Sequence, residues 1–419
     1  MTDTAAPTAT SRTAPPPAVT GPAADLPHFP FPAGPLAPPA EYAERRTGCP
    51  LGHVQLPSGD EAVLLVTYQD AAAALADARL SHDLTAPDAP RLTAEPSFFN
   101  NPDSMLTKEG EEHLRIRRIV ASSFTPRRVE RWKPVIEQIA GDLLDRLQQA
   151  GPPADIVADY CFQLPVRVIC RLLGVPEHDA PRFRDWSNAF VSAAQMTAQQ
   201  QMEQIREFSA YMADLIARRR DEPGDALIDD LIAARDGTDR LSESELLHLS
   251  AGLLAAGNET TSNALGRFVV ALLGEGRGPW ERLVADPDLL PAAVDELLRF
   301  VILGNGATLR IATEDVDLPS GRITAGQAVA ICGNSAQWDE SAYPEPGTLR
   351  FDRDAPPALT FGGGAHYCLG AHLAKAELRI GLGLLVARFP ALRLTVAPDE
   401  LRFTEGEILS SLVALPVTW

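Results

Sequence analysis

Phe361-Gly-Gly-Gly-Ala-His-Tyr-Cys368-Leu-Gly370 is a glycine-rich stretch near the C-terminus that contains one cysteine. Its glycines allow sharp turns and let the backbone approach a flat partner closely, because they carry no side chain that would collide with it. A helix directly after the cysteine is predicted by apolar residues at helical spacing, Leu369, Leu373, Ala376 and Ile380. The N-H groups and dipole at the start of that helix favour a thiolate at Cys368, and a thiolate is a strongly donating metal ligand.

A lone cysteine restricts the kind of metal site that this stretch can form. One cysteine cannot complete a tetrahedral zinc or iron-sulfur site, but a single thiolate suffices as the axial ligand of a haem. The order Phe-x-x-Gly-x-His-x-Cys-x-Gly resembles the haem-ligand loop of the cytochrome P450 family. The resemblance implies haem b as the cofactor, with Cys368 as the iron ligand and Phe361, His366 and Gly370 in the cofactor-binding loop. The alternative is a buried free cysteine in a turn, and five motif positions matched within ten residues favour the haem site.

Composition is that of a globular protein with a substantial core. The chain has 419 residues, of which 45% are hydrophobic and 22% charged. Five cysteines without paired spacing, and no visible secretory signal, predict a cytoplasmic location. No stretch approaches the roughly 20 apolar residues of a membrane span. The net charge of −19 argues against nucleic acid as a partner. We therefore expect a monomer that binds neither nucleic acid nor a membrane.

Two segments are predicted, a tail and one catalytic domain. Residues 1–25 are rich in Pro, Ala and Thr and are expected to be disordered. Residues 26–419 carry the resemblance, which implies a mainly α fold with a small β region, the triangular prism of the P450 family with a long central helix over the haem. We expect an extended segment over 26–39, a strand over 62–68, a short helix over 69–77, and helices over 129–236 that break at 151–153 and 175–176.

The longest predicted helix runs from Ser242 to about Leu273. Ser242 and Glu245 match a capping box, and Gly274 is a plausible end. Its centre contains a glycine, an acid and two threonines, although a mid-helix glycine costs about 1 kcal/mol. We interpret this as a locally widened helix that makes room for a small molecule beside a metal. A glycine kink with a solvated acid is the alternative.

This central segment also resembles the Gly-x-Asp/Glu-Thr pattern on the long helix of the P450 family, with matches at Gly257, Glu259 and Thr260. The resemblance implies that Glu259 and Thr260 are catalytic and relay protons to bound dioxygen. It also implies that Ala256 lies against the cofactor.

Three basic residues are candidates for binding the two haem propionates. His113 and Arg117 are four residues apart and therefore share one face of a helix. A mixed-charge surface helix is the alternative, but the resemblance implies that this pair and Arg310 bind the propionates. Ala358 departs from the family, because many relatives have a histidine ten residues before the ligand cysteine. Anchoring is thus expected to rest on His113, Arg117 and Arg310, or on a further partner.

Glu296 and Arg299 form a Glu-x-x-Arg pair, which by itself is common on helix surfaces. The resemblance implies a structural pair on the proximal side of the haem, joined by a third basic residue downstream. Arg350 is the candidate for that residue. We assign these residues to the scaffold, outside catalysis.

The resemblance, to the actinobacterial type of soluble bacterial P450, implies a haem-thiolate monooxygenase that activates O2 to hydroxylate or otherwise oxidise a small organic molecule of secondary metabolism. Electrons are expected from NAD(P)H through a ferredoxin reductase and a ferredoxin, because the chain contains no flavin or iron-sulfur motif. Candidates for a basic ferredoxin landing site are Arg115, Arg118, Arg127, Arg128 and Lys375.

Two alternatives stay open. The first is a P450 that forms C-C or C-N bonds or rings, for example in aromatic or cyclic dipeptide substrates, without net oxygen insertion. The second is a non-catalytic haem-binding protein, which would have no use for Glu259 and Thr260. Candidate pocket segments by family position are 81–101 with Phe98 and Phe99, 190–196, 255–260, 301–308 and 408–412.

Overall fold

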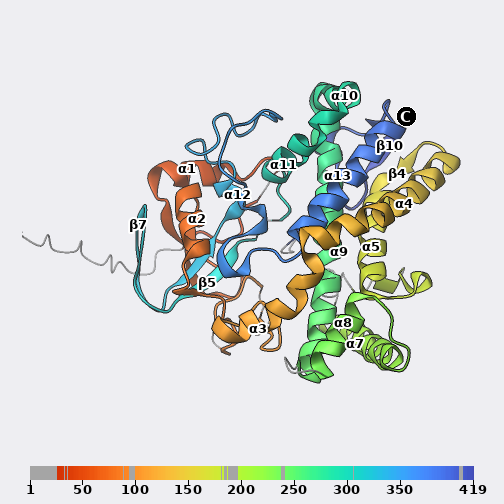
Figure 1. Ribbon diagram of the computed structural model, residues 1–419. Helices are drawn as coiled ribbons and strands as arrows, with labels where there is room; N and C mark the ends of the chain where they lie inside the picture. The colour runs from red at the N-terminus through yellow and green to blue at the C-terminus, as the bar shows by residue number, and fades with distance from the viewer. Residues whose placement is uncertain are drawn as a thin grey trace, which may run out of the picture.

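Figure 1 shows a computed structural model in which a mostly helical part lies beside a smaller part that contains the main β-sheet. The structure describes residues 26–404 and 409–419, except 33, 35, 88, 94–99, 181, 184–185, 187–196, 237–240 and 305. The predicted tail, Phe98, Phe99, the 190–196 segment and Ile408 lie outside the described residues.

Helices make up most of the described fold, as predicted. The helices are α1 (Ala40–Gly48), α2 (Tyr68–Ala76), α3 (Gly110–Ala121), α4 (Pro126–Ala150), α5 (Gln163–Leu173), α7 (Ala198–Asp221), α8 (Leu227–Asp236), α9 (Glu243–Leu273), α10 (Gly278–Ala285), α11 (Leu290–Phe300), α12 (Gly333–Ala336) and α13 (Ala371–Arg388). The helix breaks predicted at 151–153 and 175–176 are confirmed, because α4 ends before Gly151 and α5 ends before Gly174. Residues 26–39 form no helix where they are described, also as predicted.

The main sheet has five strands in the order β1-β2-β8-β5-β3. These strands are β1 (Leu51–Gln55), β2 (Glu61–Leu65), β8 (Ala328–Ile331), β5 (Thr308–Ala312) and β3 (Leu80–Ser81). Only β2 and β8 pair in parallel within this sheet. The smaller sheets are formed by β4 (Ala154–Asp155), β10 (Pro416–Thr418) and β9 (Arg393–Leu394), and by β6 (Val316–Leu318) and β7 (Gly321–Ile323). The strand predicted over 62–68 ends at Leu65, because the Thr67 side chain caps α2 by accepting a hydrogen bond from the Asp70 backbone N-H.

The long central helix α9 matches the prediction at both ends. Ser242 and Glu245 form a reciprocal capping box, and Gly274 is the C-cap. The predicted local widening is wrong, because α9 is regular α-helix through its centre. Gly257 instead allows α5 to pack closely, since a Cβ atom at this position would lie 3.2 Å from Ile169 Cδ1.

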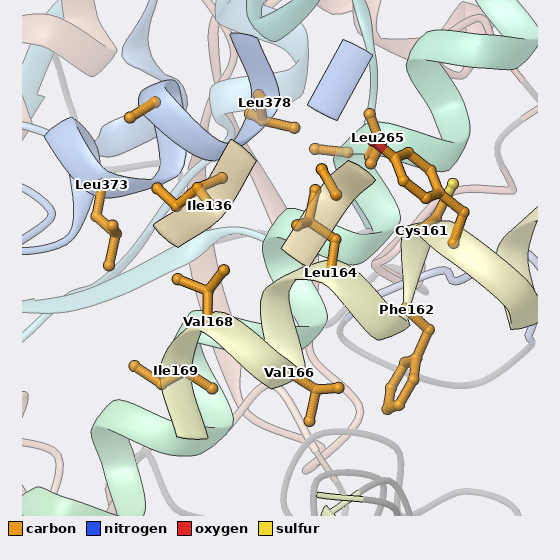
Figure 2. Close-up of a cluster of buried hydrophobic side chains, with 14 of the residues drawn as sticks. Ile136, Cys161, Phe162, Leu164, Val166, Val168, Ile169, Leu265, Leu373 and Leu378 are labelled. Carbon is orange, nitrogen blue, oxygen red and sulfur yellow. The ribbon is translucent and has the colours of Figure 1, made fainter. Parts of the chain in front are cut away.

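The core between the long helices holds α9 and α13 in place. In Figure 2, Leu164 and Val168 of α5 lie among Ile136 of α4, Leu265 of α9 and Leu378 of α13. All five side chains are almost completely buried. Each such side chain contributes on the order of 2 kcal/mol through burial. The two helices that carry the main candidate residues are therefore fixed relative to each other by apolar packing through α5.

Glu296 and Arg299 form an ion pair that a third basic residue joins, as expected, but this third residue is not the predicted one. Both residues of the pair are buried. Arg299 donates to both carboxylate oxygens of Glu296, at 2.8 and 2.9 Å. The predicted third residue, Arg350, was wrong, because only its backbone N-H reaches Glu296 while its side chain lies near Asp352. Arg353 takes that place, donating from Nε to both Glu296 oxygens at 3.0 and 3.1 Å. A buried carboxylate requires such paired donors, so this cluster has a structural role.

Candidate active site

The turn around Cys368 lies at the N-terminal end of α13, with Gly370 at the cap position. The Cys368 backbone N-H donates to the Phe361 carbonyl at 2.9 Å and closes the turn. Gly362 and Gly364 have φ angles of 71° and 64°, in the region that favours glycine. A Cβ atom at Gly364 would also collide with the Leu75 carbonyl of α2. The glycines predicted to allow a sharp turn and a close approach are required here for both reasons.

Two opposing influences act on the Cys368 thiol. Burial raises its pKa, whereas hydrogen bonds from the backbone N-H groups of Gly370 and Ala371 and the nearby Arg117 guanidinium lower it. The helix-start contribution predicted from sequence is therefore present, but burial outweighs it. A coordinating metal ion deprotonates a thiol outright, so a bound iron would supply what the protein surroundings lack.

A cavity of about 500 Å³ lies between the Cys368 turn and the middle of α9. Nine of the ten predicted site residues line it, from four parts of the chain: Ala256 and Thr260 on α9, His113 and Arg117 on α3, Arg310 on β5, and Phe361, His366, Cys368 and Gly370 in the turn. The tenth, Glu259, is not among the lining residues. The structure thus brings together residues that are more than 250 positions apart in sequence.

The two predicted catalytic residues lie in different surroundings. Thr260 lines the cavity, and its Oγ1 donates to the Ala256 carbonyl one turn earlier at 2.8 Å. Glu259 is buried and accepts a hydrogen bond from Ser411 Oγ at 2.8 Å. Ser411 was not predicted as a site residue, although it lies in the 408–412 pocket segment.

One side of the cavity is rich in buried basic groups. His113 and Arg310 are 2% and 3% exposed. Burial lowers the pKa of Arg310 to about 9 and also lowers the pKa of Arg117. Burial, with His366 and Arg117 nearby, lowers the pKa of His113 to about 4. Neither arginine forms an ion pair with a carboxylate among the residues that the structure describes.

These features fit a haem. The Nε2 atom of His113 is buried and has no hydrogen-bond partner within the described part of the chain, and that of His366 is buried with only the Glu109 carboxylate near it, at 3.6 Å. Buried polar atoms normally have partners, and buried cations normally have counter-charges. A haem would provide both through its two carboxylates, while its iron would face the sulfur of Cys368. Ala358 is not among the cavity-lining residues, so it contributes nothing to this wall.

Sequence reasoning missed several polar residues of the cavity. His82 follows β3 and lies against His366, with ring centroids 3.9 Å apart. Arg91, Asn100, Ser104 and His248 line the cavity as well. His82, Arg91 and Asn100 fall in the 81–101 segment that was predicted to border the pocket, whereas Ser104 and His248 lie outside every predicted pocket segment.

Comparisons with known proteins agree with this geometry. The model of the family "Cytochrome P450" matches residues 269–409. Mycinamicin IV hydroxylase/epoxidase of Micromonospora griseorubida is 42% identical over 381 residues, which cover 90% of this chain and 94% of the relative. Nocardicin C N-oxygenase of Nocardia uniformis subsp. tsuyamanensis is 41% identical with the same coverage. The crystal structure of the putative thioether synthase SgvP, involved in the tailoring step of griseoviridin, superimposes with a TM-score of 0.89 at 37% identity and covers 94% of this chain and 100% of that chain.

Among the described residues, no helix combines the length and the apolar character needed to cross a bilayer.

Proposed function

The chain belongs to the cytochrome P450 family of oxidoreductases, and on this premise we propose that it oxidises a small organic molecule of secondary metabolism in the cavity between α9 and Cys368. The main support for this proposal is that Thr260 on α9 and Cys368 in the turn before α13 line the same cavity. A bound haem supplies the activation of O2 at a thiolate-ligated iron. The named activities of the two relatives, a hydroxylase/epoxidase and an N-oxygenase, support oxygen insertion as the reaction.

In this proposal, two groups of residues bind the cofactor, one at its iron and ring and the other at its carboxylates. Cys368 holds the iron, and the glycines of its turn keep the backbone close to the ring. Arg117 and Arg310 neutralise the two carboxylates, and His113 and His366 donate hydrogen bonds to them. Hydrogen bonds between charged partners are about twice as strong as neutral ones, so these contacts fix the orientation of the cofactor.

In this proposal, Thr260 and Glu259 on α9 deliver protons from the side of the cavity opposite Cys368. The Thr260 hydroxyl faces the cavity and can pass on a proton while it keeps contact with the Ala256 carbonyl. Glu259 is bonded to Ser411, so a relay through Glu259 includes the Ser411 hydroxyl or requires this hydrogen bond to break. General acid-base groups of this kind typically contribute about 100-fold or more to a rate.

Away from the basic wall and the Cys368 turn, the cavity lining is mainly apolar with a few polar groups. Leu84, Leu249 and Leu253 offer apolar contacts, whereas Arg91 and His248 offer hydrogen bonds. Pockets of this character fix a ligand mostly by apolar contact and orient it by a few polar groups. We therefore propose a largely apolar substrate with a small number of hydrogen-bonding groups.

Electrons are proposed to arrive from NAD(P)H through a ferredoxin reductase and a ferredoxin. Three residues of the predicted basic landing site form ion pairs, Arg115 with Glu245, Arg128 with Asp230, and Lys375 with Asp295. Arg118 and Arg127 are exposed and form no ion pair among the described residues. These two residues are the stronger candidates for contacting an acidic ferredoxin.

The test of the proposed function is the carbon monoxide spectrum of the reduced protein, expressed with ample porphyrin supply. The wild type should give the red-shifted absorption of a thiolate-ligated haem, and Cys368→Ser should not. Cys49→Ser is the matched control, since Cys49 is a free cysteine outside the cavity lining. A haem-thiolate spectrum that survives Cys368→Ser would refute the assignment.

A second candidate reaction is bond formation without oxygen insertion. The similarity to a putative thioether synthase supports it. Product masses separate the two reactions, because hydroxylation adds one oxygen atom and coupling removes hydrogen atoms.

A further inference from the structure

His82 is a half-buried histidine beside the basic wall of the cavity, and the P450 resemblance did not identify it. Its side chain lines the cavity next to Arg310 and His366. We propose that His82 is an additional positioning residue, which donates a hydrogen bond from Nε2 to a haem carboxylate. This inference rests on the proposed function, because it requires that the cavity holds a haem.

The position of His82 is fixed by the helix that carries the predicted propionate pair. The carboxylate of Glu109, at the N-cap of α3, accepts hydrogen bonds from the His82 backbone N-H and from Ser81 Oγ. Since His113 and Arg117 lie on α3, His82 shares one framework with them. These hydrogen bonds to Glu109 therefore fix the position of His82 at the cavity.

The hydrogen bond to Arg310 decides which nitrogen of His82 carries the proton. Arg310 Nη1 lies 2.8 Å from His82 Nδ1, and a guanidinium can only donate. Nδ1 must therefore accept, and the proton of the neutral ring is on Nε2. Burial, together with Arg310, His366 and His113, lowers the pKa of His82 far below its usual value, so the ring stays neutral.

The Nε2-H group of His82 is thus a donor that lacks an acceptor. It is buried and has no hydrogen-bond partner in the described part of the chain. His113 Nε2 shares this condition, whereas His366 Nε2 lies 3.6 Å from Glu109 Oε2. The His366 ring stacks on His113, with centroids 4.1 Å apart, and is tilted against His82, with centroids 3.9 Å apart. The Nε2-H group of His82, together with the unpaired Nε2 of His113 and the guanidinium groups of Arg310 and Arg117, forms a site for carboxylate oxygens.

A metal ion is not the alternative occupant of this cluster. No group of three His, Cys, Asp or Glu side chains among the described residues has the arrangement of a metal site. The Nδ1 lone pair of His82 already accepts from Arg310, and its Nε2 carries a proton. The positive charges of Arg310 and Arg117 attract an anion to this wall of the cavity and repel a cation.

His82 also accounts for the departure at Ala358. An alanine offers no side-chain donor, and Ala358 does not line the cavity. His82 directly follows the edge strand β3, which pairs with β5, and this places its side chain beside Arg310. The chain thereby keeps a third histidine for the carboxylates at a different position in the sequence.

Two substitutions separate a direct role of His82 from a role through Arg310. In His82→Asn the amide oxygen lies where Nδ1 lay and keeps an acceptor for Arg310, but no donor reaches the position of Nε2. In His82→Gln the amide nitrogen lies where Nε2 lay and restores the donor. His248→Ala is the matched control, because His248 lines the cavity from α9.

The readout is the rate at which the ferric, haem-loaded protein loses haem to excess apomyoglobin. His82→Asn should lose haem at least about tenfold faster than the wild type, because a hydrogen bond to a charged group is worth that factor or more. His82→Gln should stay within about threefold of the wild type. The carboxylate bending band in the resonance Raman spectrum should shift in His82→Asn and stay in place in His248→Ala.

Any other order of the two variants overturns the proposal. Retention by His82→Asn with loss by His82→Gln assigns the role to Arg310, and equal rates mean that Nε2 does not touch the cofactor. A wild type that binds no haem refutes the proposed function instead, so the two failures are distinguishable. Both variants keep a polar side chain of similar size, so a folding defect shared by both also counts against a specific role for Nε2.

Discussion

Replacing Arg353 with methionine tests the buried ion-pair cluster of Glu296, Arg299 and Arg353. The Arg353 guanidinium donates to both oxygens of Glu296 and to the carbonyls of Pro344 and Thr348, the latter two at 2.6 Å. Its side chain is 7% exposed. Removing one partner from a buried ion pair costs about 3–5 kcal/mol. Because Arg299 still neutralises Glu296, we expect the lower end, about 3 kcal/mol.

This free-energy loss converts into a measurable shift of the unfolding midpoint. The entropy of unfolding is about 2 cal/mol/K per residue, or roughly 0.8 kcal/mol/K for about 390 residues. A loss of about 3 kcal/mol then lowers Tm by about 4 °C. The assay is differential scanning calorimetry of the purified protein at matched haem content, with Arg350→Met as the control.

Arg350→Met should lower Tm by less than about 1 °C. The Arg350 side chain is 42% exposed, and the bond that Arg350 makes to Glu296 comes from its backbone N-H, which the substitution retains. Equal shifts in the two variants would show that the cluster has been assigned to the wrong arginine. A shift below about 1 °C in Arg353→Met would refute the burial argument itself.

Three further predictions concern the cofactor, the proton path and the redox partner. Arg310→Met should accelerate haem loss about tenfold or more relative to Arg310→Lys, because only the lysine keeps a positive charge beside the carboxylates; equal rates in an apomyoglobin transfer assay would contradict this. Thr260→Val should raise the peroxide formed per NAD(P)H consumed while Thr260→Ser should not, because valine keeps the volume of threonine without its hydroxyl; a peroxide yield unchanged in Thr260→Val would exclude the relay. Arg118→Glu combined with Arg127→Glu should slow reduction by ferredoxin and flatten its dependence on salt, whereas Lys133→Glu, farther along α4, should not; stopped-flow traces with the same salt slope for both would rule out this landing site.

Local patterns explain why much of the fold and site could be predicted. The capping box at Ser242 and Glu245 lies within four residues, so a short window of sequence contains both partners. The turn at Cys368 is equally local, because Gly362 and Gly364 adopt the positive φ angles that glycine favours. The mainly α architecture and the family assignment follow from such segments in their order along the chain.

The parts that could not be predicted depend on how distant segments meet. Arg350 and Arg353 are three residues apart, and nothing local determines which side chain reaches the buried Glu296. His82 gains its role only because the edge strand β3 brings it beside Arg310, which is 228 residues away in sequence. The local widening expected at Gly257 failed for the same reason, since the glycine serves a contact with a different helix, α5.

Contacts between distant segments also connect Glu259, which we propose as a proton-relay residue, to two of the predicted pocket segments. Glu259 accepts from Ser411, and one turn later on α9 Asn263 donates to the carbonyls of Leu303 and Ser410, at 2.8 and 3.0 Å. Arg267 also donates to the Ser410 carbonyl. One face of α9 thus holds both loops that were predicted to border the substrate. Because a regular helix keeps these side chains in a fixed spacing, the 410–411 segment is held against the same face of α9 as Glu259, although neither Ser410 nor Ser411 is among the cavity-lining residues.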